Sequence, residues 1–160
     1  MASREDFLKL TVNEGEFYLK DLMQNVEDYY RDKLALNKTE FKTERYNDCI
    51  LKGDFDRSIE VIQNIMENAI KYGDGKFIGI AFSEEEDFKL ITVSNSGVTL
   101  KENELPHIFD SFWRGSNAAC EEGSGLGLYI CRQLMLKMDG DIFAHIEGNM
   151  MKVTVVFKRI

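Results

Sequence analysis

Residues 56–73, DRSIEVIQNIMENAIKYG, carry the pattern around which the rest of the fold can be arranged. Apolar residues recur at intervals of three and four, which predicts one buried face of a helix over 56–72 with Asp56 as its N-cap. The residues on this face are Ile59, Ile62, Ile65, Met66, Ala69 and Ile70. A second set repeats at the same spacing and forms a polar stripe beside the apolar face: Asn64, Asn68, Lys71 and Tyr72. Because a solvated face more usually carries Glu and Lys, we interpret this stripe as a candidate site.

The composition is that of one soluble domain with a core of useful size. The chain has 160 residues, of which 44% are hydrophobic and 30% are charged. A net charge of −8 argues against a nucleic-acid-binding protein, because phosphate would repel it. The longest apolar runs are too short to span a bilayer, and no secretory signal is expected. Three scattered cysteines without a CxxC pair indicate reduced thiols rather than disulfides or a zinc site.

Outward from the central helix, extended and helical patterns alternate. The predicted helices cover residues 17–36, 56–72 and 125–138, and the predicted strands cover residues 41–46, 49–51, 76–82, 88–93, 141–146 and 151–157. We expect the first two strands to pair as a short hairpin and the last two to form a tight hairpin around Gly148. The acidic residues 83–87 are expected to form a solvated tip. This order of elements predicts a single α/β sandwich, an open mixed sheet with helices on one face.

Three local features point to a ligand that carries phosphate. In the polar stripe, an amide oxygen is a suitable ligand for Mg2+, and Lys71 can meet phosphate as a point charge. Tyr72 could stack on a ring or simply pack. The second feature is the glycine-rich segment 122–128, EGSGLGL. Its glycines let the backbone approach a ligand closely, and the helix that begins there directs free N–H groups at an anion.

The third feature is the strand end at residues 95–99, NSGVT. Its simplest interpretation is a turn. Its functional interpretation is a floor for a flat ligand, in which Asn95 supplies a hydrogen-bonding edge and Gly97 allows close approach.

Other reactive side chains give no such signal. His107 and His145 have no partner at ligand spacing, and nothing local suggests a Ser-His-Asp or Cys-His arrangement. The aromatic cluster Phe109, Phe112 and Trp113 is typical of a core, and its place before a loose segment also leaves open a docking or lid role.

Four segments resemble the motif boxes of the histidine kinase catalytic and ATP-binding domain: QNIMENAIKYG (63–73) its N box, VSNSGVTL (93–100) its G1 box, LPHIFDSFWRG (105–115) its F box and GSGLGLYICRQL (123–134) its G2 box. They stand in the family's order, which makes them far more specific together than any one alone. The resemblance covers residues 17–160 and leaves 1–16 as a residual linker from an upstream dimerisation domain. It implies the Bergerat fold shared with gyrase and related ATPases. This fold is an α/β two-layer sandwich, with a mixed five-stranded sheet, about three helices on one face and an ATP lid over 114–124.

The resemblance implies ATP and Mg2+ as ligands and gives roles to the polar stripe. Asn68 would hold Mg2+, with Asn64 beside it. Lys71 would meet the phosphates, and Tyr72 would stack against adenine. Asn64 stands where hydrolysing relatives place a glutamate that activates water. Since an amide cannot act as that general base, the site is expected to hold ATP for transfer.

The F and G2 boxes imply further contacts. Arg114 would reach the γ-phosphate. The other residues assigned to nucleotide binding by the resemblance are Phe109 and Phe112 of the F box, the phosphate-flanking Gly123, Gly125 and Gly127, and Leu126 and Leu128, which would anchor the lid helix.

The G1 box departs from the family pattern Asp-x-Gly-x-Gly. Asn95 replaces the aspartate and Thr99 replaces the second glycine, whereas Gly97 is kept. In the family this aspartate accepts a hydrogen bond from the adenine amino group. An asparagine carbonyl can still accept that bond, but without charge assistance, which would weaken binding by on the order of 1 kcal/mol.

The resemblance therefore predicts the ATP-binding catalytic domain of a two-component sensor histidine kinase, which transfers the γ-phosphate to a histidine on a separate dimerisation domain. That domain and a downstream response regulator are the expected partners, because residues 1–16 are too short for a phosphoacceptor hairpin. We expect a monomeric, cytoplasmic domain of a parent protein anchored in the cell membrane. Two alternatives stay open: a regulatory pseudokinase that binds nucleotide and signals through its F-box aromatics, and a serine-protein kinase of the anti-sigma type, which shares the fold.

Overall fold

A mixed sheet of five strands forms one layer of the fold. The computed structural model describes residues 10–110 and 127–160 of the chain. The strands of this sheet lie in the order β2 (Glu40–Thr43), β4 (Phe77–Glu85), β5 (Phe88–Ser96), β7 (Met150–Lys158) and β6 (Asp141–Glu147). β2 runs parallel to β4, and the other neighbours are antiparallel. The mixed five-stranded sheet implied by the resemblance is confirmed.

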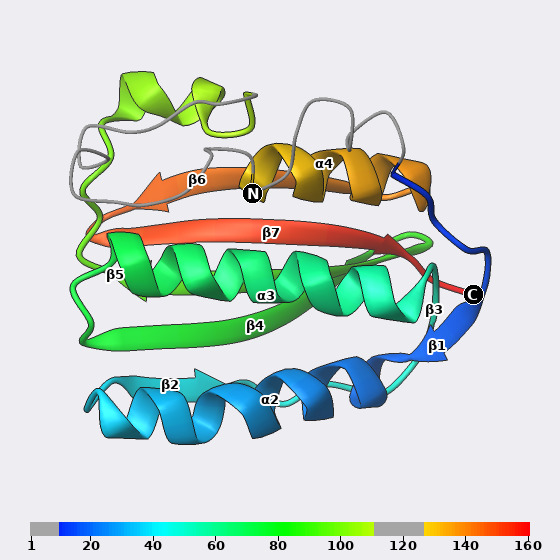
Figure 1. Ribbon diagram of the computed structural model, residues 1–160, viewed down its shortest axis with the longest axis horizontal. Helices are drawn as coiled ribbons and strands as arrows, with labels where there is room; N and C mark the ends of the chain where they lie inside the picture. The colour runs from blue at the N-terminus through cyan, green and yellow to red at the C-terminus, as the bar shows by residue number, and fades with distance from the viewer. Residues whose placement is uncertain (1–9, 111–126) are drawn as a thin grey trace.

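Helices form the second layer. α2 (Leu19–Leu36), α3 (Phe55–Tyr72) and α4 (Gly127–Lys137) lie side by side over one face of the sheet, with α3 in the middle (Figure 1). A 3-10 helix, η1 (Glu102–His107), follows β5. The predicted two-layer sandwich is confirmed, and so are the three predicted helices, with every described end within two residues of the prediction. Residues 125 and 126, predicted to begin the third helix, lie outside the described residues.

The central helix α3 is held by the apolar face that its sequence predicts. Ile62, Ile65, Met66 and Ala69 are buried there as predicted, whereas Ile59 and Ile70 are only partly buried. Val61, which was not in the predicted face, is fully buried as well. Burying each large aliphatic side chain contributes about 2 kcal/mol before the entropy of folding is counted. The prediction that Asp56 caps this helix is wrong, because Asp54 is the N-cap and its carboxylate accepts the backbone N–H of Arg57 at 3.1 Å. Asp56 lies in the first turn instead, where a negative charge favours the helix dipole.

The predicted hairpin of residues 41–46 and 49–51 is wrong. β2 lies at the edge of the large sheet beside β4, and β3 (Ile50–Lys52) pairs with β1 (Glu16–Tyr18) in a separate two-stranded ribbon. In the connection between β2 and β3, the carboxylate of Asp48 accepts the backbone N–H of Lys20 at 2.9 Å. This bond holds the connection beside the first turn of α2 instead of beside β2. Phe17, predicted as the first residue of a helix, therefore belongs to β1.

The strands β4 and β5 are longer than predicted. β4 continues to Glu85, so the acidic tip narrows to Glu86 and Asp87. Glu84 stays in the strand because its carboxylate pairs with Lys89 and Arg159, each at 3.1 Å. Lys89 is itself 4% exposed, so its ammonium lies within the fold, whereas the Glu84 side chain stays partly open to solvent. By contrast, β6 and β7 form the predicted tight hairpin, with Gly148 at φ +60°.

Residues 10–16 are fastened to the helical layer. Leu10 and Val12 pack against the core. The Arg57 guanidinium donates to the Thr11 carbonyl at 3.0 Å, and the Asn13 backbone N–H donates to the Asp54 carboxylate at 2.9 Å. The segment assigned to a linker thus contacts the first turn of α3 directly, and its assignment to an upstream domain stays a prediction.

Candidate active site

Asn64 and Asn68 of the polar stripe lie half-buried, one turn apart on α3. The side-chain nitrogen of Asn68 donates to the backbone carbonyl of Asn64 at 2.9 Å. This bond fixes which way the Asn68 amide points, because its nitrogen is used and its oxygen Oδ1 is the end left for a ligand. Within the described residues, that oxygen accepts no hydrogen bond.

The beginning of α4 lies opposite these amides. A Cβ atom built on Gly127 would lie 3.8 Å from the Asn68 amide nitrogen and 4.0 Å from the Asn64 amide oxygen. The two segments are about 60 residues apart in the sequence, and the fold places them face to face. A glycine here leaves the space above both amides open, next to a helix start whose backbone N–H groups attract anions.

The side chain of Cys131, on α4, lies against Asn64. It is fully buried on α4, and its thiol contacts the Val61 carbonyl at 3.7 Å. Burial raises the pKa of the Cys131 thiol to about 12, with the Asn64 side chain opposing that shift. The thiol is therefore protonated at neutral pH and fills the interface between α3 and α4.

The G1 segment closes the site at the end of α3. Asn95 is 5% exposed, and its amide nitrogen donates to the Ser96 carbonyl at 3.2 Å. Gly73 is required beside it, since a Cβ there would lie 2.8 Å from the Asn95 nitrogen and 2.7 Å from the Ala69 carbonyl. Thr99 donates its hydroxyl to the Tyr72 carbonyl at 3.4 Å, which joins the G1 segment to the last turn of α3.

Gly97 is needed for contact with the protein itself. It has φ +77°, and a Cβ there would lie 2.4 Å from the Cβ of Asp74. Asp74 directly follows Gly73 at the end of α3. The hydroxyl of Ser96 donates to its carboxylate at 2.7 Å and the backbone N–H of Lys76 at 3.0 Å, and these bonds hold the pKa of the Asp74 carboxyl below its usual range. The only local signal of this role was an acidic residue directly after Gly73, because its partner Ser96 lies 22 residues further along the sequence.

The structure describes the first half of the F box, residues 105–110. Phe109 is buried, and the Arg132 guanidinium lies 4.2 Å from the centre of its ring. Arg132 also donates to the Ile142 carbonyl at 2.7 Å, so it links α4 to β6 and to the segment that follows η1. Leu128 is partly buried and packs against the core, and its role in anchoring the lid helix stays a prediction. Phe112, Arg114, Gly123, Gly125 and Leu126 lie outside the described residues.

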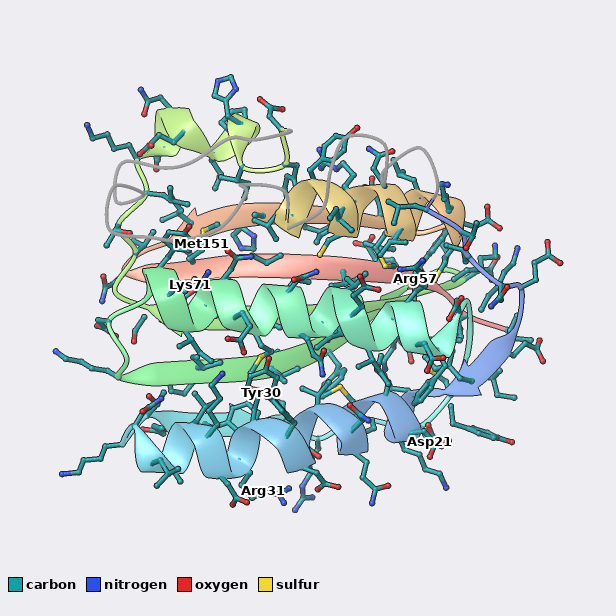
Figure 2. All side chains as sticks on the ribbon, in the orientation of Figure 1. Asp21, Tyr30, Arg31, Arg57, Lys71 and Met151 are labelled. Carbon is teal, nitrogen blue, oxygen red and sulfur yellow. The ribbon has the colours of Figure 1, made fainter. Side chains whose placement is uncertain are left out.

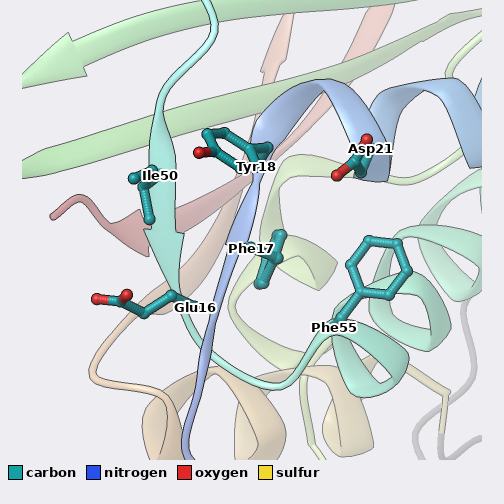
Figure 3. A pocket seen from close by; sticks show the side chains of 6 residues that line it. All are labelled: Glu16, Phe17, Tyr18, Asp21, Ile50 and Phe55. Carbon is teal, nitrogen blue, oxygen red and sulfur yellow. The ribbon is translucent and has the colours of Figure 1, made fainter.

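The polar stripe thus lies on the C-terminal half of α3, with the G1 segment and the start of α4 beside it. Figure 2 shows Lys71 near the C-terminal end of this helix. A separate hollow of about 540 Å³ lies near the other end, beside Phe55 (Figure 3). It is lined by Glu16, Phe17, Tyr18, Asp21, Ile50 and Phe55. The described residues contain no group of three or more His, Cys, Asp or Glu that could hold a metal ion, and no helix in them could cross a membrane.

The family model for histidine kinase-, DNA gyrase B-, and HSP90-like ATPases matches residues 53–159. Among curated relatives, the sensor histidine kinase RcsC of Escherichia coli is 36% identical over 102 residues, which cover 62% of this chain and 11% of RcsC. The sensor histidine kinase WalK of Bacillus subtilis is 28% identical, over 92% of this chain and 30% of WalK. This chain therefore spans less than a third of either relative.

Solved structures share the whole fold. The nucleotide-free catalytic domain of the histidine kinase ThkA superposes with a TM-score of 0.80 and 26% identity, over 92% of this chain and 96% of that one. The structure of ThkA in complex with the response regulator protein TrrA superposes with a TM-score of 0.77 and 23% identity, over 93% of this chain and 42% of that one.

Proposed function

Since this chain belongs to the family of histidine kinase-, DNA gyrase B-, and HSP90-like ATPases, we propose that it binds ATP with Mg2+ and transfers the γ-phosphate to a histidine on another domain. The observation that carries this proposal is that Gly127 faces the side chains of Asn64 and Asn68, so closely that a Cβ on Gly127 would contact both. This placement brings the N box and the start of the G2-box helix side by side.

The donor set at the amides fits Mg2+. Mg2+ prefers oxygen ligands, keeps several waters and is commonly shared with substrate phosphates. The Asn68 oxygen is the free end of its amide, so Asn68 would supply one protein ligand and Asn64 would stand beside it. The ion would supply charge neutralisation of the phosphates.

The phosphates would lie between the end of α3 and the start of α4. Lys71 would supply a positive charge on one side, and the backbone N–H groups at Gly127 would face the phosphates from the other. Arg114, Gly123 and Gly125 would complete this set, with Leu126 and Leu128 anchoring the helix.

The base would lie against the G1 segment. The Asn95 amide nitrogen is used by Ser96, so its oxygen is the end available to accept the adenine amino group. Gly97 and Thr99 shape this floor, and Tyr72 would stack on the ring. Phe109 is buried beneath Arg132, so its part would be to support the F box, with Phe112 nearer the nucleotide.

Catalysis would come from position and charge. The site would hold the γ-phosphate in line with an imidazole nitrogen and neutralise the charge on its oxygens, which is where phosphoryl transfer gains most. Asn64 cannot take a proton from water, so hydrolysis would be slow.

The partners would be a dimerisation domain that carries the phosphoacceptor histidine and a response regulator that receives the phosphate. The solved complex of ThkA with TrrA supports this kind of partner. The domain would act in the cytoplasm, where ATP is present, within a parent protein anchored in the membrane. A regulatory pseudokinase is the second candidate, because Asn95 gives the base a neutral acceptor where the family has a charged one.

Calorimetry with ATP, ADP and Mg2+ tests the site. We expect micromolar binding by this chain and about tenfold weaker Mg2+-dependent binding by Asn68→Ala, the loss of one ligand bond. No binding to the unmodified chain would reject the proposal. Mixing the chain with a dimerisation fragment and labelled ATP then separates the candidates. Acid-labile label on histidine supports the kinase, whereas binding without transfer supports the pseudokinase.

A further inference from the structure

Helix α2 contacts the turn of α3 that carries the amides of Asn64 and Asn68. Tyr30 is 1% exposed between the two helices, where Figure 2 labels it. Its hydroxyl donates to the Glu67 carboxylate at 2.6 Å and lies 3.4 Å from the Gln63 carbonyl. Gln63 and Glu67 directly precede Asn64 and Asn68, so these contacts hold the turn on which the proposed metal ligand lies.

Both oxygens of Glu67 are occupied from the α2 side. The Lys33 ammonium lies 3.2 Å from one oxygen and 3.1 Å from the other. The oxygen at 3.1 Å also accepts the Tyr30 hydroxyl. A lone surface pair of Lys and Glu contributes little, but a buried hydroxyl on the same carboxylate fixes its direction.

An unrestrained carboxylate at this position would reach the phosphate end of the site. Side chains three and four residues apart on a helix are neighbours, so Glu67 has Asn64 on one side and Lys71 on the other. A carboxylate near a γ-phosphate can take a proton from water, which the amides of Asn64 and Asn68 cannot do. The structure turns the only carboxylate between these two amides toward α2.

We propose that Tyr30 and Lys33 are positioning residues that hold Glu67 away from the phosphates and so protect bound ATP from hydrolysis. This inference rests on the proposed ATP site. In the reaction that it prevents, a water oxygen forms a bond to the γ-phosphorus, its proton passes to Glu67, and the bond to the bridging oxygen breaks to release ADP and phosphate.

The test is phosphate release from Mg2+-ATP by the double variant Tyr30→Phe/Lys33→Met of the full chain. The same double variant with Glu67→Gln added removes the carboxylate. The matched control is Tyr29→Phe/Lys20→Met, which deletes the same two kinds of group from the same helix. Neither of the deleted groups bonds to Glu67, and Phe keeps the Tyr29 ring that packs edge-on against Tyr30 at 4.7 Å. Tyr29 is 55% exposed, so its hydroxyl is not needed for packing.

We expect the double variant to hydrolyse bound ATP about tenfold faster than the unmodified chain, at the lower limit of general-base catalysis because the group is not optimally placed. Adding Glu67→Gln should return the rate to its starting value, and the control should not change it. A merely structural role would weaken binding and lower the unfolding temperature without raising hydrolysis.

Two results would overturn the inference: ATP binding by the double variant with an unchanged rate, or a faster rate that persists after Glu67→Gln. Should the double variant not fold, Tyr30→Phe alone decides, by a smaller increase in rate or by none. Absence of ATP binding by the unmodified chain is a different result, because it rejects the proposed function itself.

Discussion

Replacing Tyr30 by Phe should destabilise the fold by about 2 kcal/mol. The substitution keeps the ring and removes one hydroxyl that is buried at 1% exposure and donates to a carboxylate at 2.6 Å. A hydrogen bond to a charged group contributes about 1.5–3 kcal/mol. The loss should fall in the lower part of that range, because Lys33 stays on the same carboxylate. For a chain of this size the unfolding temperature should fall by roughly 5 °C.

The pH dependence gives the same prediction a second test. Burial, followed by the hydrogen bond to Glu67, raises the pKa of Tyr30 well above its usual value. A group with a raised folded pKa contributes stability that is complete below its unfolded pKa, about 10, and is lost as pH rises above it. The unmodified chain should therefore lose stability above pH 10 more steeply than the Tyr30→Phe variant.

Urea unfolding followed by circular dichroism between pH 7 and 11 measures both effects, with Tyr29→Phe as the control. A Tyr30→Phe loss at pH 7 no larger than that of the control, or parallel stability curves above pH 10, would refute the reasoning.

Three further predictions concern the site itself. Gly97→Ala should destabilise the chain by about 3 kcal/mol in thermal unfolding, because it adds a Cβ 2.4 Å from that of Asp74 at φ +77°; an unchanged unfolding temperature would contradict this. Cys131, with the pKa of its thiol raised to about 12, should react with a disulfide reagent at neutral pH only at the rate of unfolding, which mass spectrometry of the modified peptide can follow; fast modification of the folded chain would count against its burial. Asp74 has a lowered folded pKa, so its contribution to stability is present above its unfolded pKa, about 4, and is lost as pH falls further. Asp74→Asn should accordingly flatten acid unfolding below pH 4, and an unchanged acid limb would exclude this role.

The helices were predictable because their signal is local. The spacing of Ile62, Ile65 and Met66 places one face of α3 in the core whatever lies opposite, and the structure buries all three. The polar stripe followed from the same period, and the position of Gly127 opposite both amides agrees with the order of the motif boxes. The nucleotide roles of the individual residues stay predictions.

What the sequence missed depends on long-range pairing. Extended residues near Phe41 were identifiable, but their parallel partner β4 lies beyond a whole helix, so a local hairpin was chosen wrongly. Tyr30 matched the apolar period of its helix, which hid the fact that its hydroxyl binds Glu67, 37 residues on. Asp54 and Asp56 are equally good caps by residue type, and only the backbone geometry distinguishes them.

The attachment of residues 10–16 decides where a recombinant fragment of this domain can begin. A start at residue 17 would delete the partners of Arg57, Lys137 and the Gly53 amide, together with the apolar cover provided by Leu10 and Val12. It would also leave β3 without the strand residue opposite Lys52. A fragment that begins at or before residue 10 retains all of these, and a shorter one would expose the seam between the first turn of α3 and the last turn of α4 to solvent and proteases.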